Sequence, residues 1–242
     1  MRVHRRRMVV TGLIIALALG GVGTSLFLLA TGGKKPKAAA SATPTPSTSA
    51  TPGTSCTYVP KAEEATGSKG VQPPPPFTID VSKKYTATVQ TSMGTFTMKL
   101  FAEDAPCTVN SFVYLAKRKF YDGLTFHRIV KDFVIQGGDP AGNGSGGPGY
   151  TFNDELGNAL KYEIGTLAMA NSGANTNGSQ WFVVTGQQGV QLPKNYTIFG
   201  KVTKGLDVVL KIGNVETVGG SGQDAQMPKE PITIQKVTVK TS

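Results

Sequence analysis

The sequence contains few of the residues that most enzymes use as nucleophiles, bases or metal ligands. Its 242 residues include two histidines, His4 and His127, and two cysteines, Cys56 and Cys107. A nucleophilic serine or cysteine needs a base beside it, yet no serine lies in a GxSxG turn and His127 is the only histidine beyond the N-terminal tail. One histidine without a cysteine cluster does not make a zinc site. We therefore expect no covalent intermediate, no metal and no cofactor.

A phosphate-binding loop is also missing. The run GNGSGGPG at residues 142–149 is rich in glycine but lacks the Gly-Lys-Ser/Thr ending that cradles nucleotide phosphates. We interpret it as a flexible loop beside a groove.

Acidic residues are scarce only at the N-terminus. The chain carries a net charge of +10, but residues 1–37 hold seven Lys or Arg and no acid. Residues 78–242 hold 16 Lys or Arg and 13 Asp or Glu, a net charge of +3. Because the excess lies in the tail and not in a basic domain, we expect no nucleic-acid partner.

An uncharged stretch follows the arginine cluster of that tail. Residues 9–30 are 22 residues without Asp, Glu, Lys or Arg, which is about 33 Å as a helix and enough to cross a bilayer. We expect residues 1–8 to stay cytoplasmic, residues 9–30 to form an uncleaved signal anchor, and the rest to lie outside the cytoplasm. The alternative is a cleaved signal and a secreted protein.

Residues 31–76 contain almost no large apolar side chains and are rich in Pro, Ser, Thr and Ala. Such a composition does not build a core, so we predict a linker that holds a domain at 77–242 away from the membrane. In an exported protein, an even number of cysteines favours a disulfide. A Cys56–Cys107 bond would clip the linker onto the domain, and two free thiols are the alternative.

From Tyr85 onward the pattern predicts a β-rich domain. Two alternating runs flank Ser92-Met93-Gly94, a hairpin signal. Helical spacing follows, with Pro106 in the first turn and Gly123 as the end of the helix. A second short helix is expected at 205–213 and a closing strand at 232–240.

Further short apolar strands lie between the two helices, separated by Gly and Asn clusters, at 125–130, 133–138, 165–171, 179–185 and 196–202. Many short strands, two helices and no β–α–β alternation predict a mainly β fold, a closed antiparallel barrel whose open ends are covered by helices.

The stretch FHRIVKDFVIQGGD, residues 126–139, carries the candidate chemistry. Neighbouring residues of a strand point to opposite faces, so we expect His127 and Arg128 to face different sides, with His127 packed away from the pocket. A turn at Lys131-Asp132 would bring Phe133 to the face of Arg128 and Gln136. Apolar walls can bind an apolar ring, and an arginine and an amide can hydrogen-bond a peptide. Such a set of groups does not cleave the peptide.

This stretch, together with MANSGANTNGSQWFVV at 169–184, resembles the cyclophilin family of peptidyl-prolyl cis–trans isomerases. The likeness runs from about Thr86 to Val239 and leaves residues 1–76 outside. It implies an eight-stranded antiparallel β-barrel capped by two α-helices. It also implies an enzyme that accelerates rotation about X–Pro bonds without a cofactor, acting on proline-containing polypeptides, here exported ones.

The resemblance also implies roles for individual residues. Arg128 would be the catalytic arginine, with Phe133 and Gln136 beside it. The substrate-binding positions implied by the family are Val134, Gly144, Ala170, Asn171, Ser172, Gln180, Phe182, Leu192 and Tyr196. Tyr196 stands where many members have a histidine.

Many eukaryotic members grip cyclosporin with a tryptophan that would fall near Gln191. This chain has a single tryptophan, Trp181, inside the second motif, so we expect weak cyclosporin binding. We also expect a monomer. The alternatives are a proline-peptide binding or tethering module with incidental turnover, and a cell-envelope protein that uses the barrel as a scaffold.

Overall fold

The computed structural model describes residues 56–64, 67–218 and 226–242. The expected cytoplasmic tail, the expected membrane span and most of the expected linker lie outside these ranges. Within them, no helix has both the length and the apolar character needed to cross a bilayer.

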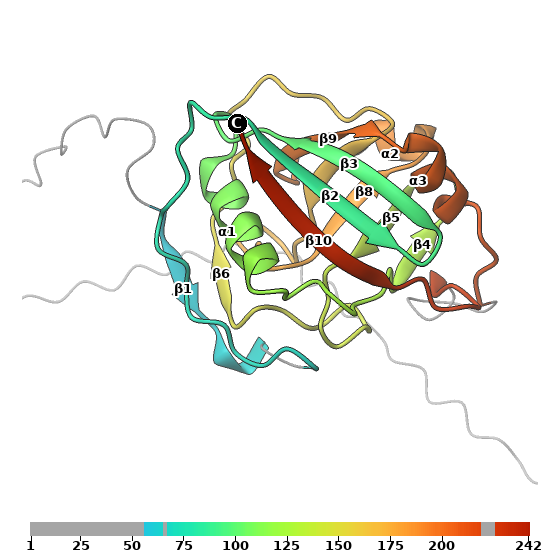
Figure 1. The fold of residues 1–242 in the computed structure, drawn as a ribbon, viewed down its shortest axis with the longest axis horizontal. Coiled ribbons are helices and arrows are strands. Elements are labelled where there is room, and N and C mark those ends of the chain that lie inside the picture. The colour runs from blue at the N-terminus through green and yellow to red at the C-terminus, as the bar shows by residue number, and fades with distance from the viewer. Residues whose placement is uncertain (1–55, 65–66, 219–225) are drawn as a thin grey trace, which may run out of the picture. The chain divides into compact units, whose positions relative to one another are not determined.

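The core of the fold is one antiparallel eight-stranded sheet that curls on itself (Figure 1). Its strands follow the order β10-β2-β3-β9-β7-β8-β5-β4. Their bounds are β2 Tyr85–Thr91, β3 Gly94–Leu100, β4 Arg128–Val130, β5 Val134–Gly137, β7 Thr166–Met169, β8 Trp181–Val184, β9 Ile198–Lys204 and β10 Ile234–Thr241. All eight overlap segments that the sequence pattern predicted as strands, although β9 runs on to Lys204 and β10 to Thr241, past the predicted ends at 202 and 240.

The sheet closes only through a short seam, which corrects the predicted closed barrel. No ladder joins the edge strands β4 and β10 in the part of the chain that the structure describes. Instead, the residues that precede them form a bridge between Thr125 and Thr233. On either side of it the amide of Phe126 donates to Ile232 O at 3.0 Å and the amide of Ile234 donates to Leu124 O at 2.7 Å. The amide of Gly123 also donates to Ile234 O at 2.7 Å, so the seam is a short run of backbone hydrogen bonds.

The two predicted helices are α1, Pro106–Lys117, and α3, Leu206–Gly213. Helix α1 lies against β10, and α3 lies against β3, β4 and β5.

The prediction that α1 extends to Gly123 is wrong, because the helix ends at Lys117. Lys119 has φ +57°, a left-handed conformation that breaks the helical hydrogen-bond ladder. The sequence pattern also missed the single-turn helices η1, Ala62–Glu64, and α2, Gln187–Val190.

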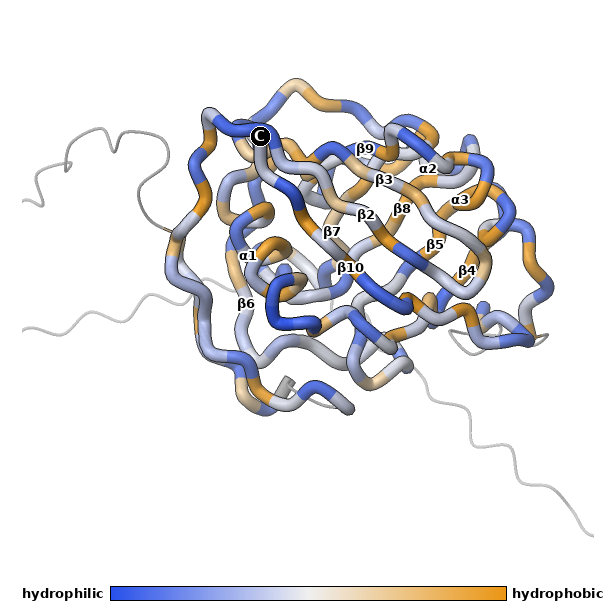
Figure 2. The backbone as a smooth tube through the Cα atoms, viewed as in Figure 1, coloured by the Kyte–Doolittle hydropathy of each residue, from blue (hydrophilic) through white to orange (hydrophobic). Residues whose placement is uncertain are grey.

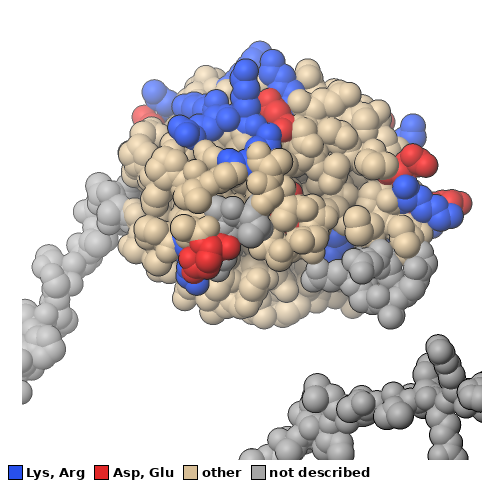
Figure 3. All heavy atoms as spheres, turned by 90° about the horizontal axis from the view of Figure 1, so that it is seen from below, with Lys and Arg blue, Asp and Glu red and all other residues tan. Residues whose placement is uncertain are grey.

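Apolar side chains fill the inside of the curl. On β3, Phe96, Met98 and Leu100 are buried while the residues between them are not, and Figure 2 shows hydrophobic and hydrophilic residues interleaved along the front strands. Trp181 is fully buried, with the rings of Phe112 and Phe126 packed edge-on against it. On the outer face seen in Figure 3, charged side chains form small groups of both signs and most of the surface is uncharged.

Part of the expected linker belongs to the folded domain. Residues 56–64 and 67–76, which we call the strap, contain β1, Tyr58–Pro60, which pairs antiparallel with β6, Tyr150–Phe152. The Cys56–Cys107 disulfide is present and joins the strap to α1. We predicted a linker here because the segment has few apolar side chains. Backbone pairing and a covalent bond stabilise it instead, and neither requires apolar side chains.

The packing at the seam can be tested with Phe126→Ala. The ring is fully buried against Trp181, so its removal leaves a cavity and should lower the free energy of unfolding by about 3–5 kcal/mol. Val71→Ala is the control, since Val71 is 57% exposed and its loss should stay within about 0.5 kcal/mol. Urea unfolding measures both, and a loss for Phe126→Ala as small as that of the control would contradict the described packing.

Candidate active site

Strand register brings the candidate catalytic residues together. Arg128 on β4 is the cross-strand partner of Gln136 on β5, which is in turn the partner of Phe182 on β8. Directly opposed residues of an antiparallel ladder lie on the same face with Cβ atoms about 4.5–5.5 Å apart. These three side chains therefore form one row across the sheet, although Phe182 is far from Arg128 in the sequence.

A tight turn between β4 and β5 adds Phe133 to this row, as the sequence suggested. Asp132 has φ +57°, and the amide of Phe133 donates to Val130 O at 3.1 Å. Helix α2 fastens the turn, because Asp132 accepts hydrogen bonds from the amides of Gln187 and Gln188. Gly186 is required there, since a Cβ atom on it would lie 2.2 Å from Asp132 Oδ1. The turn shifts the register so that Phe133 and Val134 reach the same hollow.

The hollow is a cavity of about 880 Å³, within the size range of ligand sites. All twelve residues that the resemblance implied line it: Arg128, Phe133, Val134, Gln136, Gly144, Ala170, Asn171, Ser172, Gln180, Phe182, Leu192 and Tyr196. They come from β4, β5, β8 and the loops beside them, so tertiary folding gathers in one place what the sequence separates.

One wall of the cavity is apolar. Val134 and Phe182 belong to a small hydrophobic cluster of their own, on which Phe133, Leu192 and Tyr196 pack. The rings of Phe182 and Tyr196 meet edge to face with centroids 5.5 Å apart. This wall suits a compact apolar ring.

A chain of hydrogen bonds joins polar residues that line the cavity beside that wall. Arg128 Nη1 donates to Gln136 Oε1 at 3.3 Å, and Gln136 Nε2 donates to Gln180 Oε1 at 2.9 Å. Gln180 Nε2 then donates to the carbonyl oxygens of Gly144 and Gly146, each at 2.9 Å. At the other end, Arg128 Nε donates to Gln226 Oε1. The guanidinium is thus held in one orientation.

Arg128 remains a cation in this setting. Its burial lowers the pKa of the guanidinium, and the nearby Tyr196 opposes that shift, but an arginine side chain stays protonated in proteins. The charge lies 5.8 Å from the centre of the Phe133 ring, close enough for a cation–π interaction.

The glycine-rich loop forms the remaining wall. Asp139 is buried and its carboxylate accepts hydrogen bonds from the amides of Ala141, Asn143 and Gly144. With Gln180 bound to the carbonyls of the same loop, the loop has a defined shape. The sequence predicted that this loop lies beside a groove, and its position beside the cavity confirms that.

The expectation that His127 faces away from the pocket is wrong. His127 borders the cavity beside Arg128, although it is only 5% exposed. Strand alternation does not apply to it, because β4 begins at Arg128 and His127 lies in the extended segment before it. Neither ring nitrogen has a hydrogen-bond partner among the described residues. Burial lowers the pKa of the imidazole, with Asp139 opposing and Arg128 assisting, so the ring is neutral.

Two lining residues carried no signal in the sequence. Gln226 and Met227 lie in the segment before β10 and reach the cavity next to Arg128. No motif connects them with Arg128, from which Gln226 is separated by 98 positions. Only the tertiary structure shows that this segment contacts Arg128.

Comparisons with known proteins agree with this geometry. Residues 86–239 match the family model described as cyclophilin type peptidyl-prolyl cis-trans isomerase/CLD. The Neurospora crassa peptidyl-prolyl cis-trans isomerase-like 1 is 49% identical over 133 residues, 53% of this chain and 81% of that protein. Its Mus musculus counterpart is 48% identical over 133 residues, 53% of this chain and 80% of that protein.

A solved structure is similar as well. The crystal structure of a Cryptosporidium parvum cyclophilin type peptidyl-prolyl cis-trans isomerase superposes with a TM-score of 0.60 at 32% identity, covering 66% of this chain and 99% of that chain. The same protein was also solved in the presence of the dipeptide Ala-Pro. From the family match, these relatives and the shared fold, the chain belongs to the cyclophilin-type peptidyl-prolyl cis-trans isomerases.

Proposed function

We propose that the cavity isomerises X–Pro bonds by a hydrogen bond from Arg128 to the prolyl nitrogen. Rotation about the bond has a barrier of about 18–20 kcal/mol because it breaks amide conjugation. In the twisted transition state the nitrogen regains a lone pair, which the planar ground state does not offer. An N–H donor aimed at that lone pair binds the transition state more tightly than the substrate.

The observation that carries this proposal is the way Arg128 is held by two hydrogen bonds beside an apolar wall. Two of its five N–H groups have partners among the described residues, Gln136 and Gln226, so three are left for a peptide. Phe133, Val134, Phe182 and Leu192 are then placed to enclose the proline ring. A cyclophilin of the same fold was solved in the presence of Ala-Pro, which supports a proline dipeptide as the core of the substrate.

Gln136 and Gln180 have different parts in this proposal. Both amide hydrogens of Gln180 go to the loop carbonyls and its oxygen accepts from Gln136, so Gln180 positions its neighbours. Gln136 retains one N–H for the peptide backbone. Asn171 lies at the rim with Ala170, Ser172 and Gly144, where the residues on either side of the proline would run.

We further propose that the enzyme is anchored in a membrane and acts on exported proteins. The uncharged stretch at residues 9–30 behind an arginine cluster supports an anchor. The Cys56–Cys107 disulfide supports an oxidising compartment outside the cytoplasm.

A monomeric state and weak cyclosporin binding stay predictions. The expected tryptophan position is near Gln191, which follows α2 and precedes Leu192 of the cavity wall.

Arg128→Ala tests the mechanism. A charged hydrogen bond is worth about 1.5–3 kcal/mol, so kcat/KM should fall by about one to two orders of magnitude. A proline-limited refolding assay and exchange spectroscopy on an X–Pro peptide measure the rate, and circular dichroism checks the fold. Lys204→Ala, which removes an exposed basic residue on β9, is the charge-matched control. Wild-type turnover in a folded Arg128→Ala protein would refute the assignment.

His127→Asn tests whether the histidine is a base. The unfolded chain binds a proton near pH 6.5, whereas burial, with Arg128 adding to it and Asp139 opposing it, lowers the pKa of the folded imidazole. The unfolded state therefore binds more protons below pH 6.5, and the stability of the wild type should fall as the pH drops toward about 5.

The free energy of unfolding of His127→Asn should lack this part of the pH dependence. Urea unfolding of the wild type and of the variant at a series of pH values measures the difference. Its kcat/KM should stay within about threefold of the wild type, because the proposed reaction transfers no proton. A selective loss of turnover above tenfold in a folded variant would give His127 a chemical role.

Fractionation of cells that produce the full chain tests the location. An uncleaved anchor predicts full-length protein and isomerase activity in the membrane pellet, released by detergent but retained in high salt. A shorter protein in the medium would instead indicate a cleaved signal.

A further inference from the structure

We propose that the strap is a positioning element of the active site. In this view it fixes the glycine-rich loop that forms one wall of the cavity, and the Cys56–Cys107 disulfide keeps it in place, so that substrate affinity depends on the disulfide. The proposal rests on the proposed function of the cavity as the proline-peptide site.

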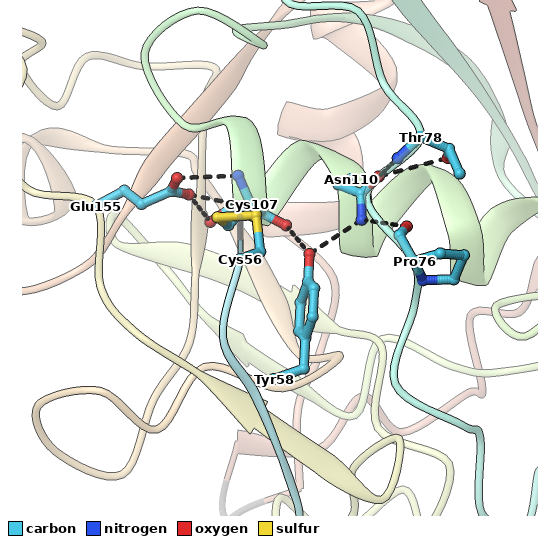
Figure 4. Close-up of a disulfide and its surroundings, with 8 residues drawn as sticks. Cys56, Tyr58, Pro76, Thr78, Cys107, Asn110 and Glu155 are labelled. Carbon is cyan, nitrogen blue, oxygen red and sulfur yellow. Dashed lines mark hydrogen bonds between the residues drawn. A yellow bond between two sulfur atoms is a disulfide. The ribbon is translucent and has the colours of Figure 1, made fainter. Parts of the chain in front are cut away.

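Both ends of the strap are fastened to α1. At the first end, Cys56 is bonded to Cys107 and the hydroxyl of Tyr58 donates to Cys107 O at 2.8 Å (Figure 4). At the second end, Asn110 Nδ2 donates to Pro76 O at 3.0 Å. The same Nδ2 also donates to the hydroxyl of Tyr58 at 3.1 Å, so one side chain of α1 links the two ends.

The anchor point on α1 is itself held from the other side. The carboxylate of Glu155 accepts hydrogen bonds from the amides of Cys107 and Thr108, each at 2.9 Å, and from the hydroxyl of Thr108 at 2.7 Å (Figure 4). These bonds satisfy amides that have no partner within the first turn of a helix. Cys107 therefore gives the strap a fixed attachment.

Between its ends the strap holds the loop by backbone hydrogen bonds. The amide of Lys61 donates to Gly149 O and the amide of Gln72 donates to Pro148 O, both at 2.8 Å. The amide of Ser68 donates to Pro140 O at 3.1 Å. The strap thus forms hydrogen bonds with both ends of the loop from 140 to 149.

From inside, Gln180 binds the middle of the same loop through Gly144 O and Gly146 O. The loop lies between the strap and the side chain that positions Gln136. Glycine-rich backbone has a large conformational entropy when it is free, and a loop that must be ordered on binding weakens the affinity for the ligand. An unfastened strap should therefore raise KM.

The effect on kcat should be small. Arg128 is also held by Gln226, which does not belong to the loop. The apolar wall comes from β5, β8, the turn before β5 and the segment after α2, none of which makes a backbone hydrogen bond to the strap in the described part of the chain. A role in positioning the loop thus predicts a rise in KM with little change in kcat. General destabilisation predicts the opposite, because it lowers the fraction of folded protein, and with it the apparent kcat, and leaves KM unchanged.

The first experiment compares the oxidised full-length chain with the same chain treated with dithiothreitol. Reduction breaks one S–S bond and leaves two thiols, while the two thiols of the reagent close into a cyclic disulfide. We expect KM for an X–Pro peptide to rise about three- to tenfold, the effect of ordering a short piece of backbone, with kcat within about twofold. The Cys56→Ser/Cys107→Ser variant should show the same KM with no response to the reagent.

A matched glycine pair separates the strap from the disulfide. Gly67 and Gly70 both have positive φ, +94° and +61°, so an alanine strains the backbone at either. A Cβ atom on Gly67 would lie 2.0 Å from Pro140 O, whereas nothing lies within 4 Å of one on Gly70. With the disulfide intact, Gly67→Ala should raise KM as reduction does and Gly70→Ala should stay near the wild type.

Amide hydrogen exchange supplies a readout that does not depend on turnover. Reduction and Gly67→Ala should each speed exchange in residues 142–149 and leave β8 unchanged. An unchanged KM in the Gly67→Ala protein overturns the proposal, as does an equal rise in both glycine variants. Full activity of Arg128→Ala beside a KM that responds to the strap would refute the proposed catalytic residue and leave the strap proposal intact.

Discussion

The register of three short strands is the constraint on which the site depends. Because Arg128 opposes Gln136 and Gln136 opposes Phe182, a cation, an amide and an aromatic ring stand in one row on the same face of the sheet. A shift of one residue in either ladder would turn every side chain of the shifted strand to the other face. The seam at Thr125 and Thr233 and the buried Trp181 cluster stabilise this register, so the curled sheet holds the row in place.

The polar side chains around Arg128 are held in place because each of them has at least one hydrogen-bond partner. Gln226, Gln136, Gln180 and the loop carbonyls satisfy one another around Arg128, and a satisfied network of this kind orients its members. The neutral His127 beside it adds no second positive charge next to the guanidinium. The cavity therefore presents one oriented cation against an apolar wall, which suits a reaction that needs a donor and no base.

Much of the fold could be predicted from local pattern, and the failures have physical causes. The hairpin around Ser92-Met93 and the strands of the sheet follow from alternation, which local sequence controls. The end of α1 did not follow, because Lys119 adopts a left-handed conformation that glycine was expected to provide. The position of His127 was missed because alternation holds only inside a strand, and β4 begins one residue later.

The sequence by itself determined the strand alternation, the shortage of nucleophiles and metal ligands, and the two motifs that resemble the cyclophilins, since all of these depend on residues that are near one another in the chain. Only the tertiary structure decided that Gln226 contacts Arg128, that Gln180 is occupied by the loop, and that the strap belongs to the folded domain. These contacts join residues far apart in sequence through backbone groups and amides. Such groups carry no periodic signal, because every residue has a backbone and amide side chains occur throughout the surface.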